Sequence, residues 1–246
     1  MVESQNINLT LLKNFRVEVT RSMLLYKFAL DEISTKVSIL QEEFQLIHEY
    51  NPIEHVNTRV KSPKSIFKKL HKRNLPLSLQ SIQENIHDIA GIRIICSFVS
   101  DIYRISNMIQ SQEDIEVIEI KDYIENPKPN GYQSLHIIMK IPVFMTYGEE
   151  HVFVEMQIRT IAMDFWASLE HKIYYKYNKK VPTRLTDELK QAAHAAAHLD
   201  RKMEKLNKEI TLLKESDVEE ELTDGQNDIE QLLFDEIEKV GLHYKQ

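Results

Sequence analysis

The sequence lacks several features that common classes of protein display. It contains only five glycines in 246 residues. None of them forms Gly-x-x-x-x-Gly-Lys or Gly-x-Gly-x-x-Gly, so a Walker loop and a Rossmann fingerprint are both excluded. The single cysteine, Cys96, excludes an internal disulfide framework. It lies inside an apolar run, which is typical of an inert core thiol in a reducing compartment.

Long apolar runs and an excess of positive charge are also missing. No apolar stretch is long enough to cross a bilayer, and the N-terminus lacks the basic segment, apolar core and cleavage site of a secretory signal. The net charge is −7, from 31 basic and 38 acidic residues. Such a balance does not favour non-specific binding to nucleic acid. We therefore expect a cytoplasmic protein that has no membrane partner and no nucleic acid as its main partner.

The length and composition indicate one soluble domain with extensions, or two small domains. Hydrophobic residues make up 42% and charged residues 28% of the chain. Apolar residues recur every three or four positions from about residue 9 to residue 50, which predicts a helix pair with a possible break at Thr20–Ser22. The Asn51-Pro52 pair ends this helical region.

Two segments predict strands that carry acidic residues. The apolar run Ile92–Val99 is typical of a strand that is buried on both faces of a sheet, and Asp88 and Gly91 lie at its start. Val152–Ile158 alternates apolar residues with Glu155 and Gln157, which places both polar side chains on one face. If the two strands are neighbours, Asp88 and Glu155 could share a hard cation such as Mg²⁺.

The remaining pattern supplies further strands and helices. Strands are expected at 115–120 and 132–141, with a turn-rich loop between them. Helices are expected at 101–112, 159–177 and 183–213. The acidic segment Ser216–Asp228 predicts a flexible linker, and a short amphipathic helix is expected at 229–240.

A short basic helix is predicted after Ser62 and Pro63, which form a good N-cap and first turn. Lys61, Ser65 and Lys69 are four residues apart, so they share one side of this helix and its entrance. Cations and a hydroxyl at a helix N-terminus suit a polyphosphate. A solvated basic face is the alternative.

Two histidines in the last helix, His194 and His198, have the i, i+4 spacing of a zinc-binding pair. No third ligand has suitable spacing nearby, so a surface pair is the simpler interpretation and zinc binding is the alternative.

Four blocks of sequence together resemble the RelA/SpoT synthetase domain. They begin with Arg59-Val-Lys-Ser-Pro-Lys-Ser-Ile66 and Asp88-Ile-Ala-Gly-Ile-Arg93, and continue with Asn130-Gly-Tyr-Gln-Ser-Leu-His136 and Val154-Glu-Met-Gln-Ile-Arg-Thr160. No hydrolase or regulatory region is visible beside them. The chain therefore resembles the small alarmone synthetases of Gram-positive bacteria. The segment Asn51–Arg59 is more similar to the RelP subclass than to the RelQ subclass.

The resemblance implies an α+β fold similar to nucleotidyltransferase palms. A mixed β-sheet of about five strands would be flanked by helices, with long N- and C-terminal helices. The expected organisation is N-terminal helices at 1–57, a synthetase core at 58–180, a C-terminal helix at 181–215, and an acidic linker with a short terminal helix at 216–246.

The resemblance also implies an activity, the transfer of a pyrophosphoryl group from ATP to the 3′-hydroxyl of GDP or GTP. The products would be AMP and ppGpp or pppGpp, the alarmones of the stringent response. Asp88 and Glu155 would be the catalytic residues and the Mg²⁺ ligands, and Glu155 is also a candidate base. The expected ATP-binding residues are Arg59, Lys61, Ser65, Lys69 and Arg93. The two arginines would sandwich adenine, and the choice between Lys68 and Lys69 stays open.

The acceptor site implied by the resemblance lies on the later strands. Its residues are Lys121, Lys128, Asn130, Tyr132, His136 and Gln157, with Tyr132 stacking on guanine. From the sequence alone, Tyr132 could equally be a strand-edge aromatic and His136 a satisfied sheet histidine. Arg159 is interpreted as anchoring the start of a helix.

Some properties are left open or predicted only by analogy. The segment Glu119–Asp122 mixes two charge patterns of the family, so a preference for GDP or GTP does not follow. A homotetramer is expected. His55, Asn57 and Asp164 occupy positions that bind activating pppGpp in RelQ-type enzymes, and this exchange predicts weak activation. The alternatives are another nucleotidyltransferase on the same fold and a non-catalytic nucleotide- or RNA-binding module.

Overall fold

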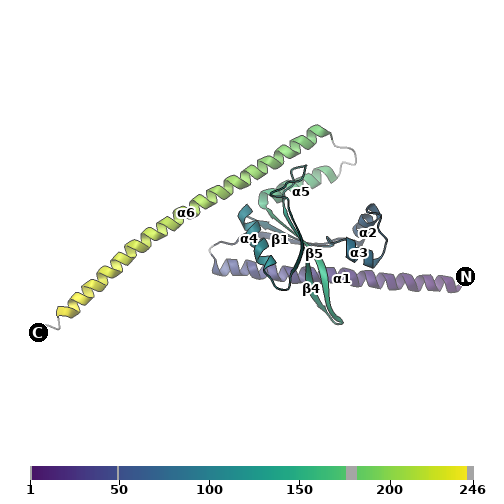
Figure 1. The fold of residues 1–246 in the computed structure, drawn as a ribbon, viewed down its shortest axis with the longest axis horizontal. Coiled ribbons are helices and arrows are strands. Elements are labelled where there is room, and N and C mark those ends of the chain that lie inside the picture. Colours follow the sequence, from purple (N-terminus) through teal and green to yellow (C-terminus); the bar gives the residue numbers. More distant parts are fainter. Residues whose placement is uncertain (1, 49, 176–181, 243–246) are drawn as a thin grey trace. The chain divides into compact units, whose positions relative to one another are not determined.

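The protein is described by a computed structural model that covers residues 2–48, 50–175 and 182–242 (Figure 1). Its contacts divide it into two units, Met1–Asp200 and Arg201–Gln246. The helices are α1 (Val2–Ile47), α2 (Pro63–Lys72), α3 (Leu79–Asn85), α4 (Val99–Gln110), α5 (Ile161–Tyr175) and α6 (Thr183–Leu242). The strands are β1 (Ile53–Val60), β2 (Ala90–Cys96), β3 (Glu116–Asp122), β4 (Leu135–Met145) and β5 (Gly148–Thr160).

The five strands form one mixed sheet in the order β1-β2-β5-β4-β3. β2 and β5 are parallel, and the other neighbouring pairs are antiparallel. This confirms the predicted α+β fold. The strand that follows Asp88 and the strand that carries Glu155 are neighbours, which was the condition for a cation shared by these two residues. The sequence pattern did not locate β1, because in this edge strand only Ile53 is fully buried.

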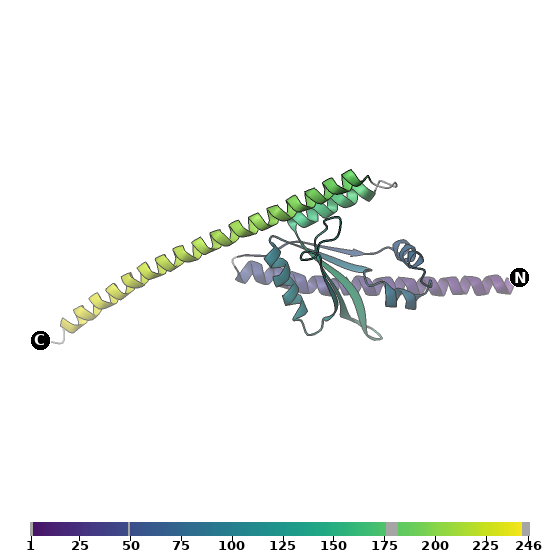
Figure 2. The ribbon, with the colours of Figure 1, turned by 45° about the horizontal axis from the view of Figure 1, so that its top comes forward.

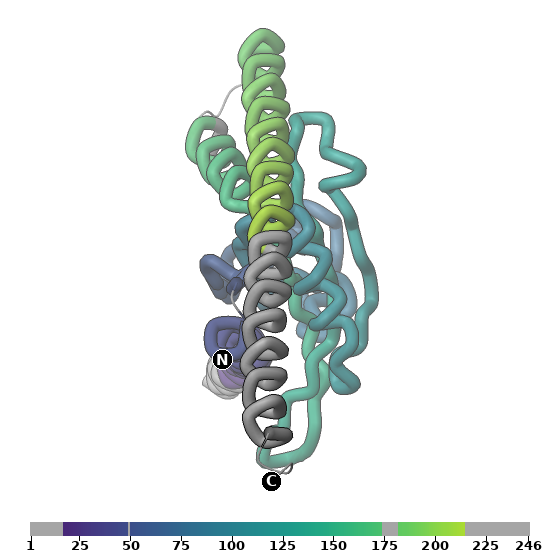
Figure 3. Tube along the Cα trace, turned by 90° about the vertical axis from the view of Figure 1, so that its left-hand side faces the viewer, coloured from purple at the N-terminus to yellow at the C-terminus, as the bar shows by residue number. Residues whose placement is uncertain are grey.

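One face of the sheet forms the main core. Ile92, Ile94, Met156 and Ile158 are at most 1% exposed, and helices α1 and α4 contact the strands that carry them. Helix α1 runs along the sheet in Figure 1 and is seen end-on in Figure 3. Cys96 is fully buried as predicted, and burial raises the pKa of its thiol.

Two predicted interruptions of helices are wrong. Helix α1 continues through Thr20–Ser22, because Thr and Ser inside a helix each cost less than about 0.7 kcal/mol relative to alanine. Helix α6 continues through 216–228, where a flexible linker was expected, and includes the expected short helix at 229–240. Gly225 alone costs about 1 kcal/mol, and the many Glu and Leu residues around it favour helix. The expected boundary at residues 180 and 181 lies outside the described residues.

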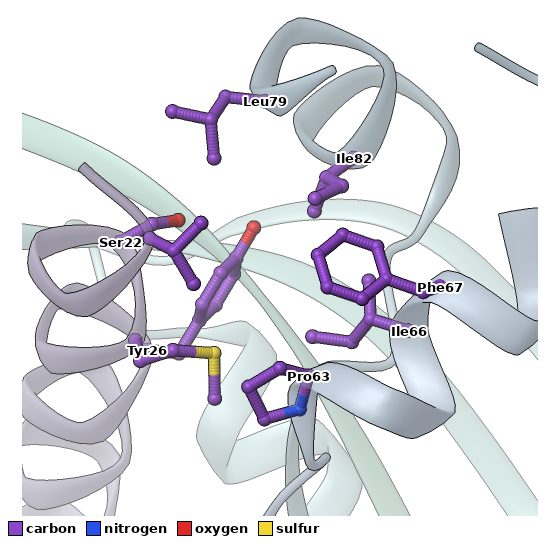
Figure 4. A pocket seen from close by; sticks show the side chains of 9 residues that line it. Ser22, Tyr26, Pro63, Ile66, Phe67, Leu79 and Ile82 are labelled. Carbon is purple, nitrogen blue, oxygen red and sulfur yellow. The ribbon is translucent and has the colours of Figure 1, made fainter. Parts of the chain in front are cut away.

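Helices α2 and α3 are held against α1 by a compact apolar contact (Figure 4). Tyr26 of α1 points toward Pro63, Ile66 and Phe67 of α2 and Ile82 of α3. The cavity among these side chains has a volume of only about 10 Å³, which is room for one water molecule at most. Burial raises the pKa of Tyr26 to about 12. This packing fixes the position of α2, the predicted phosphate-binding helix.

The C-terminal helix begins beside α5 (Figure 2). The indole Nε1 of Trp166 donates a hydrogen bond to the carbonyl of Leu189 at 3.0 Å, and Trp166, Ala167 and Ala193 form a small second core. None of the described helices is long and apolar enough to cross a membrane.

Candidate active site

Six of the predicted site residues lie in two adjacent rows across the polar face of the sheet. Strand register aligns one residue from each strand in the order β1-β2-β5-β4-β3, and adjacent partners project from the same face. The first row is Asn57, Arg93, Gln157, His136 and Lys121, and the second is Arg59, Gly91, Glu155, Ile138 and Glu119. Six of the predicted site residues therefore share one surface with Gly91.

An open cleft of about 400 Å³ lies over β1, β2 and β5. This volume falls within the usual range for a small-molecule site. The lining residues are Asn57, Thr58, Arg59, Gly91, Ile92, Arg93, Glu155 and Gln157. The two arginines expected to hold adenine thus share one cleft with the predicted catalytic carboxylate.

Asp88 lies just before β2 and is held by two lysines. Nζ of Lys61 and Nζ of Lys69 each lie 2.6 Å from its Oδ2. Burial raises the pKa of Asp88, but these two ammonium groups outweigh it, and the pKa ends below its usual value. Its other oxygen, Oδ1, is buried without a hydrogen-bond partner among the described residues. The carboxylate is therefore ionised at neutral pH, and its Oδ1 is a candidate ligand for a cation.

Helix α2 presents the other predicted phosphate-binding groups. Ser62 is the N-cap and accepts a hydrogen bond from the backbone N–H of Ser65. The two hydroxyls are 2.9 Å apart, and Ser65 is exposed. Lys69 contacts Asp88, whereas Lys68 is exposed to solvent. Of the two lysines that the sequence left undecided, Lys69 is the one beside the predicted catalytic carboxylate.

Glu155 is held by neighbours on its own face. His136 Nδ1 lies 3.2 Å from its Oε1, and Gln157 Nε2 donates a hydrogen bond to its Oε2 at 3.0 Å. Burial raises the pKa of Glu155, but His136 and Gln157 lower it further than burial raises it, even though the negative charge of Asp88 acts in the other direction. A carboxylate with a lowered pKa is a better metal ligand than a general base.

The acceptor-side residues form an aromatic cluster. The Tyr132 hydroxyl is 2.8 Å from His136 Nε2, and the rings of Tyr123 and His136 meet edge to face with centroids 5.2 Å apart. Lys128 places its Nζ 4.4 Å from the centroid of Tyr123 and 4.7 Å from that of Tyr132. A cation thus lies over the ring of Tyr132, the residue that was expected to stack on guanine.

Asn130 and Lys121 lie at the edges of this cluster. The Asn130 side chain accepts a hydrogen bond from the backbone N–H of Tyr132. The next residue, Gly131, has φ of +89°, and an added Cβ would come within 2.5 Å of Ala193 in α6. Lys121 is half-exposed and lies 2.6 Å from Glu119, which raises its pKa.

Arg159 has more contacts than its expected role at a helix start requires. Its side chain is 5% exposed. It donates hydrogen bonds to the Tyr132 hydroxyl, to Gln157 Oε1 at 2.8 Å and to Asp164 Oδ1 at 3.2 Å. The contact with Asp164 fits the expected role at a helix start, but the other two reach the predicted acceptor site. The alternation Glu155, Gln157, Arg159 was the signal that could have placed Arg159 on this face.

The chemistry of the two carboxylates fits a divalent ion. Asp88 has a buried oxygen without a partner among the described residues, Glu155 has a lowered pKa, and the charge of Asp88 acts on Glu155. In the part of the chain that the structure describes, no group of three or more histidine, cysteine or acidic residues is arranged for a metal. Two carboxylates suffice for Mg²⁺, which keeps waters and binds substrate phosphates. His194 and His198 are exposed on α6, as a surface pair would be.

Comparison with known proteins identifies the family. Residues 58–180 match the family model described as the region found in RelA and SpoT proteins. The chain is 54% identical over 199 residues to GTP pyrophosphokinase YwaC of Bacillus subtilis, covering 81% of this chain and 95% of the relative. The chain belongs to the RelA/SpoT family. It is also 37% identical to GTP pyrophosphokinase YjbM of B. subtilis, over 77% of this chain and 89% of that protein.

Solved structures of RelA/SpoT relatives show the same fold. Small alarmone synthetase 2 of B. subtilis matches with a TM-score of 0.71 at 54% identity, covering 77% of this chain and 98% of that one. Small alarmone synthetase 1 of B. subtilis, bound to its product pppGpp, matches with a TM-score of 0.73 at 36% identity, covering 78% and 98%. The higher identity to synthetase 2 is consistent with the expected RelP type.

Proposed function

We propose that the polar face of the sheet is where this small alarmone synthetase transfers a pyrophosphoryl group from ATP to the 3′-hydroxyl of GDP or GTP. The activity is that of relatives named GTP pyrophosphokinase, which match most of this chain. The observation that supports the location is the pair of rows in which Arg59, Arg93 and Glu155 line one cleft. The aromatic cluster of Tyr132 and His136 adjoins them across β5 and β4.

The donor nucleotide would bind over β1, β2 and α2. Arg59 and Arg93 offer two guanidinium groups to an adenine ring. Lys61, Ser65 and Lys69 lie at the entrance and on one side of α2, where cations and free backbone N–H groups favour phosphates. When ATP binds, its phosphates would compete with Asp88 for the two lysines.

The acceptor would bind over β4 and the loop that precedes it. Tyr132 would stack on guanine, with Asn130, His136 and Gln157 around it, and Lys121 and Lys128 would meet the 5′-phosphates. His136 and Gln157 hold the carboxylate of Glu155 by hydrogen bonds, and this carboxylate would lie between the two nucleotides.

Mg²⁺ is the metal that this donor set favours, because it prefers carboxylate and phosphate oxygens. Asp88 and Glu155 would hold it, and when bound it would neutralise charge on the transferred group. The lowered pKa of each carboxylate keeps both residues ionised at neutral pH. For the same reason we assign Glu155 a role as metal ligand rather than as the base that accepts the 3′-hydroxyl proton.

Product analysis tests the proposal. The purified protein is incubated with ATP, Mg²⁺ and either GDP, GTP or GMP, and nucleotides are separated by ion-exchange chromatography. We expect AMP and a 3′-pyrophosphorylated guanosine nucleotide in equal amounts. Release of inorganic pyrophosphate with a nucleotidylated acceptor would instead indicate a nucleotidyltransferase. No turnover with any acceptor would favour a non-catalytic binding module.

The Gly91→Ala variant probes the cleft. An added Cβ would lie 3.6 Å from the carbonyl oxygen of Arg59 and 4.0 Å from that of Glu155. Both are ordinary contacts, so the fold should lose less than about 1 kcal/mol. The methyl group enters the space between the two arginines, and we expect the KM for ATP to rise roughly tenfold. The KM for GDP serves as the internal control, and an unchanged KM for ATP would contradict the assignment.

Activation by pppGpp should be weak. The Asp164 carboxylate accepts hydrogen bonds from two arginines and offers no donor of its own to a polyphosphate. We expect saturating pppGpp to raise the initial rate by less than about twofold, because an acidic side chain disfavours a polyphosphate at that position. Strong stimulation in a pppGpp titration would overturn this expectation.

We further propose that the protein acts in the cytoplasm as a homotetramer, as the family resemblance implies.

A further inference from the structure

Asp164 joins two arginines that come from neighbouring strands. Arg93 is on β2 and Arg159 is on β5, and the parallel register places their side chains on the same face. Nη1 of Arg93 lies 3.1 Å and Nη1 of Arg159 lies 3.2 Å from the same oxygen, Oδ1 of Asp164. Asp164 is in the first turn of α5, which follows β5 directly.

The two arginines belong to different halves of the site. Arg93 lines the donor cleft, and its side chain is 36% exposed. Its Nε is buried without a partner among the described residues, so Asp164 supplies the hydrogen bond that orients its guanidinium group. Arg159 is buried and contacts the Tyr132 hydroxyl and Gln157 on the acceptor side.

A continuous chain of hydrogen bonds leads from these arginines to the predicted catalytic carboxylate. Arg159 donates to Gln157 Oε1 at 2.8 Å, and Gln157 Nε2 donates to Glu155 Oε2 at 3.0 Å. The amide of Gln157 accepts a hydrogen bond from Arg159 through its oxygen and donates one to Glu155 through its nitrogen. A movement of Arg159 would therefore move the side chains of Gln157 and Glu155 as well. The position of Arg93 is thus linked to that of Glu155 through Asp164, Arg159 and Gln157.

We propose that Asp164 is a positioning residue that couples the two nucleotide subsites. A nucleotide that stacks on Arg93 fixes this guanidinium group, and the shared carboxylate then fixes Arg159 with Tyr132 and Gln157. The second nucleotide meets a site that is already ordered, so it binds more tightly. Coupling between two ligands is reciprocal, and each raises the affinity for the other by the same factor. The inference rests on the proposed assignment of Arg93 to ATP and of Tyr132 to the acceptor.

Binding measurements under conditions without turnover test this inference. The dissociation constant of the non-hydrolysable ATP analogue AMPCPP is measured by isothermal titration calorimetry with Mg²⁺, in the absence and presence of saturating GDP. For the wild type we expect GDP to tighten AMPCPP binding by about 5- to 10-fold, and AMPCPP to tighten GDP binding equally. In Asp164→Asn the coupling factor should fall to about 1–2, because a neutral amide no longer holds two guanidinium groups.

The readout separates coupling from a structural role of Asp164 at the start of α5. The coupling factor is a ratio of two constants measured on one variant, so a fraction of inactive protein does not change it. Asp164→Glu should restore at least half of the wild-type factor, and Asp187→Asn on the exposed part of α6 is the matched control. Wild-type coupling retained in Asp164→Asn, or no coupling in the wild type, would overturn the inference. Failure of AMPCPP to bind the wild type would instead overturn the proposed function.

Discussion

Glu155→Gln should lower kcat by at least about 10³-fold, because it removes the charge that would hold the metal at the transferred group while keeping the shape of the side chain. The amide oxygen can still accept a hydrogen bond from His136, but the amide NH2 group cannot accept the hydrogen bond that Gln157 Nε2 donates, so the substitution also removes that bond. Initial rates of AMP formation with ATP and GDP give kcat. Titration with the ATP analogue AMPCPP shows whether the variant still binds the donor nucleotide.

Glu149→Gln is the matched control for this change. It makes the same substitution on the same strand, where Glu149 is exposed and pairs with His151. It should retain wild-type kcat. If Glu155→Gln kept more than a tenth of the wild-type rate, Glu155 would not be a catalytic metal ligand, and the central assignment would be wrong.

Asp88→Asn should have the second-largest effect. The neutral side chain leaves Lys61 and Lys69 close together without the carboxylate that holds both. Loss of one partner from a partly buried ionic cluster costs about 2 kcal/mol or more of stability, and we expect kcat to fall by at least about 10²-fold. Chemical denaturation and initial rates measure the two effects separately.

The pH dependence of this stability difference has a defined sign. The pKa of Asp88 is lower in the folded protein than in the unfolded chain. Its stabilising effect is therefore fully present above the unfolded value of about 3.9 and is lost as the pH falls through the folded value. The stability gap between wild type and Asp88→Asn should be constant from pH 7 to about pH 5 and should close below pH 4. A gap that does not narrow at all as the pH falls below 4 would show that the effect of the substitution is steric.

Where apolar and polar residues alternate regularly, the sequence predicted the strands of the sheet and the site residues that they carry. Period-two patterning placed Glu155 and Gln157 on one face, and the apolar run at residues 92–99 predicted the strand beside them. Both predictions depend only on local geometry. Edge strand β1 was missed because its two faces are largely polar or exposed. Its Arg59 was identified only through a family resemblance.

Contacts between side chains that are far apart along the chain could not be predicted from the sequence. The pairing of Arg93 with Asp164 joins residues 71 positions apart, and no periodic pattern records it. Arg159 was assigned to a helix start because that is its nearest neighbour in the chain. Its contacts with Tyr132 and Ser134 depend on how β4 lies beside β5. The helix interruptions were misplaced for another reason, since single Thr, Ser and Gly residues are weak breakers in long helices.

The ammonium group of Lys128 lies against the rings of Tyr123 and Tyr132. A purine that stacks on the same surface of Tyr132 must first displace this side chain. The displaced ammonium group would then be free to pair with the phosphates of the same nucleotide. Movement of this one lysine side chain would thus expose the ring of Tyr132 to the base and bring a positive charge to the phosphates of the nucleotide.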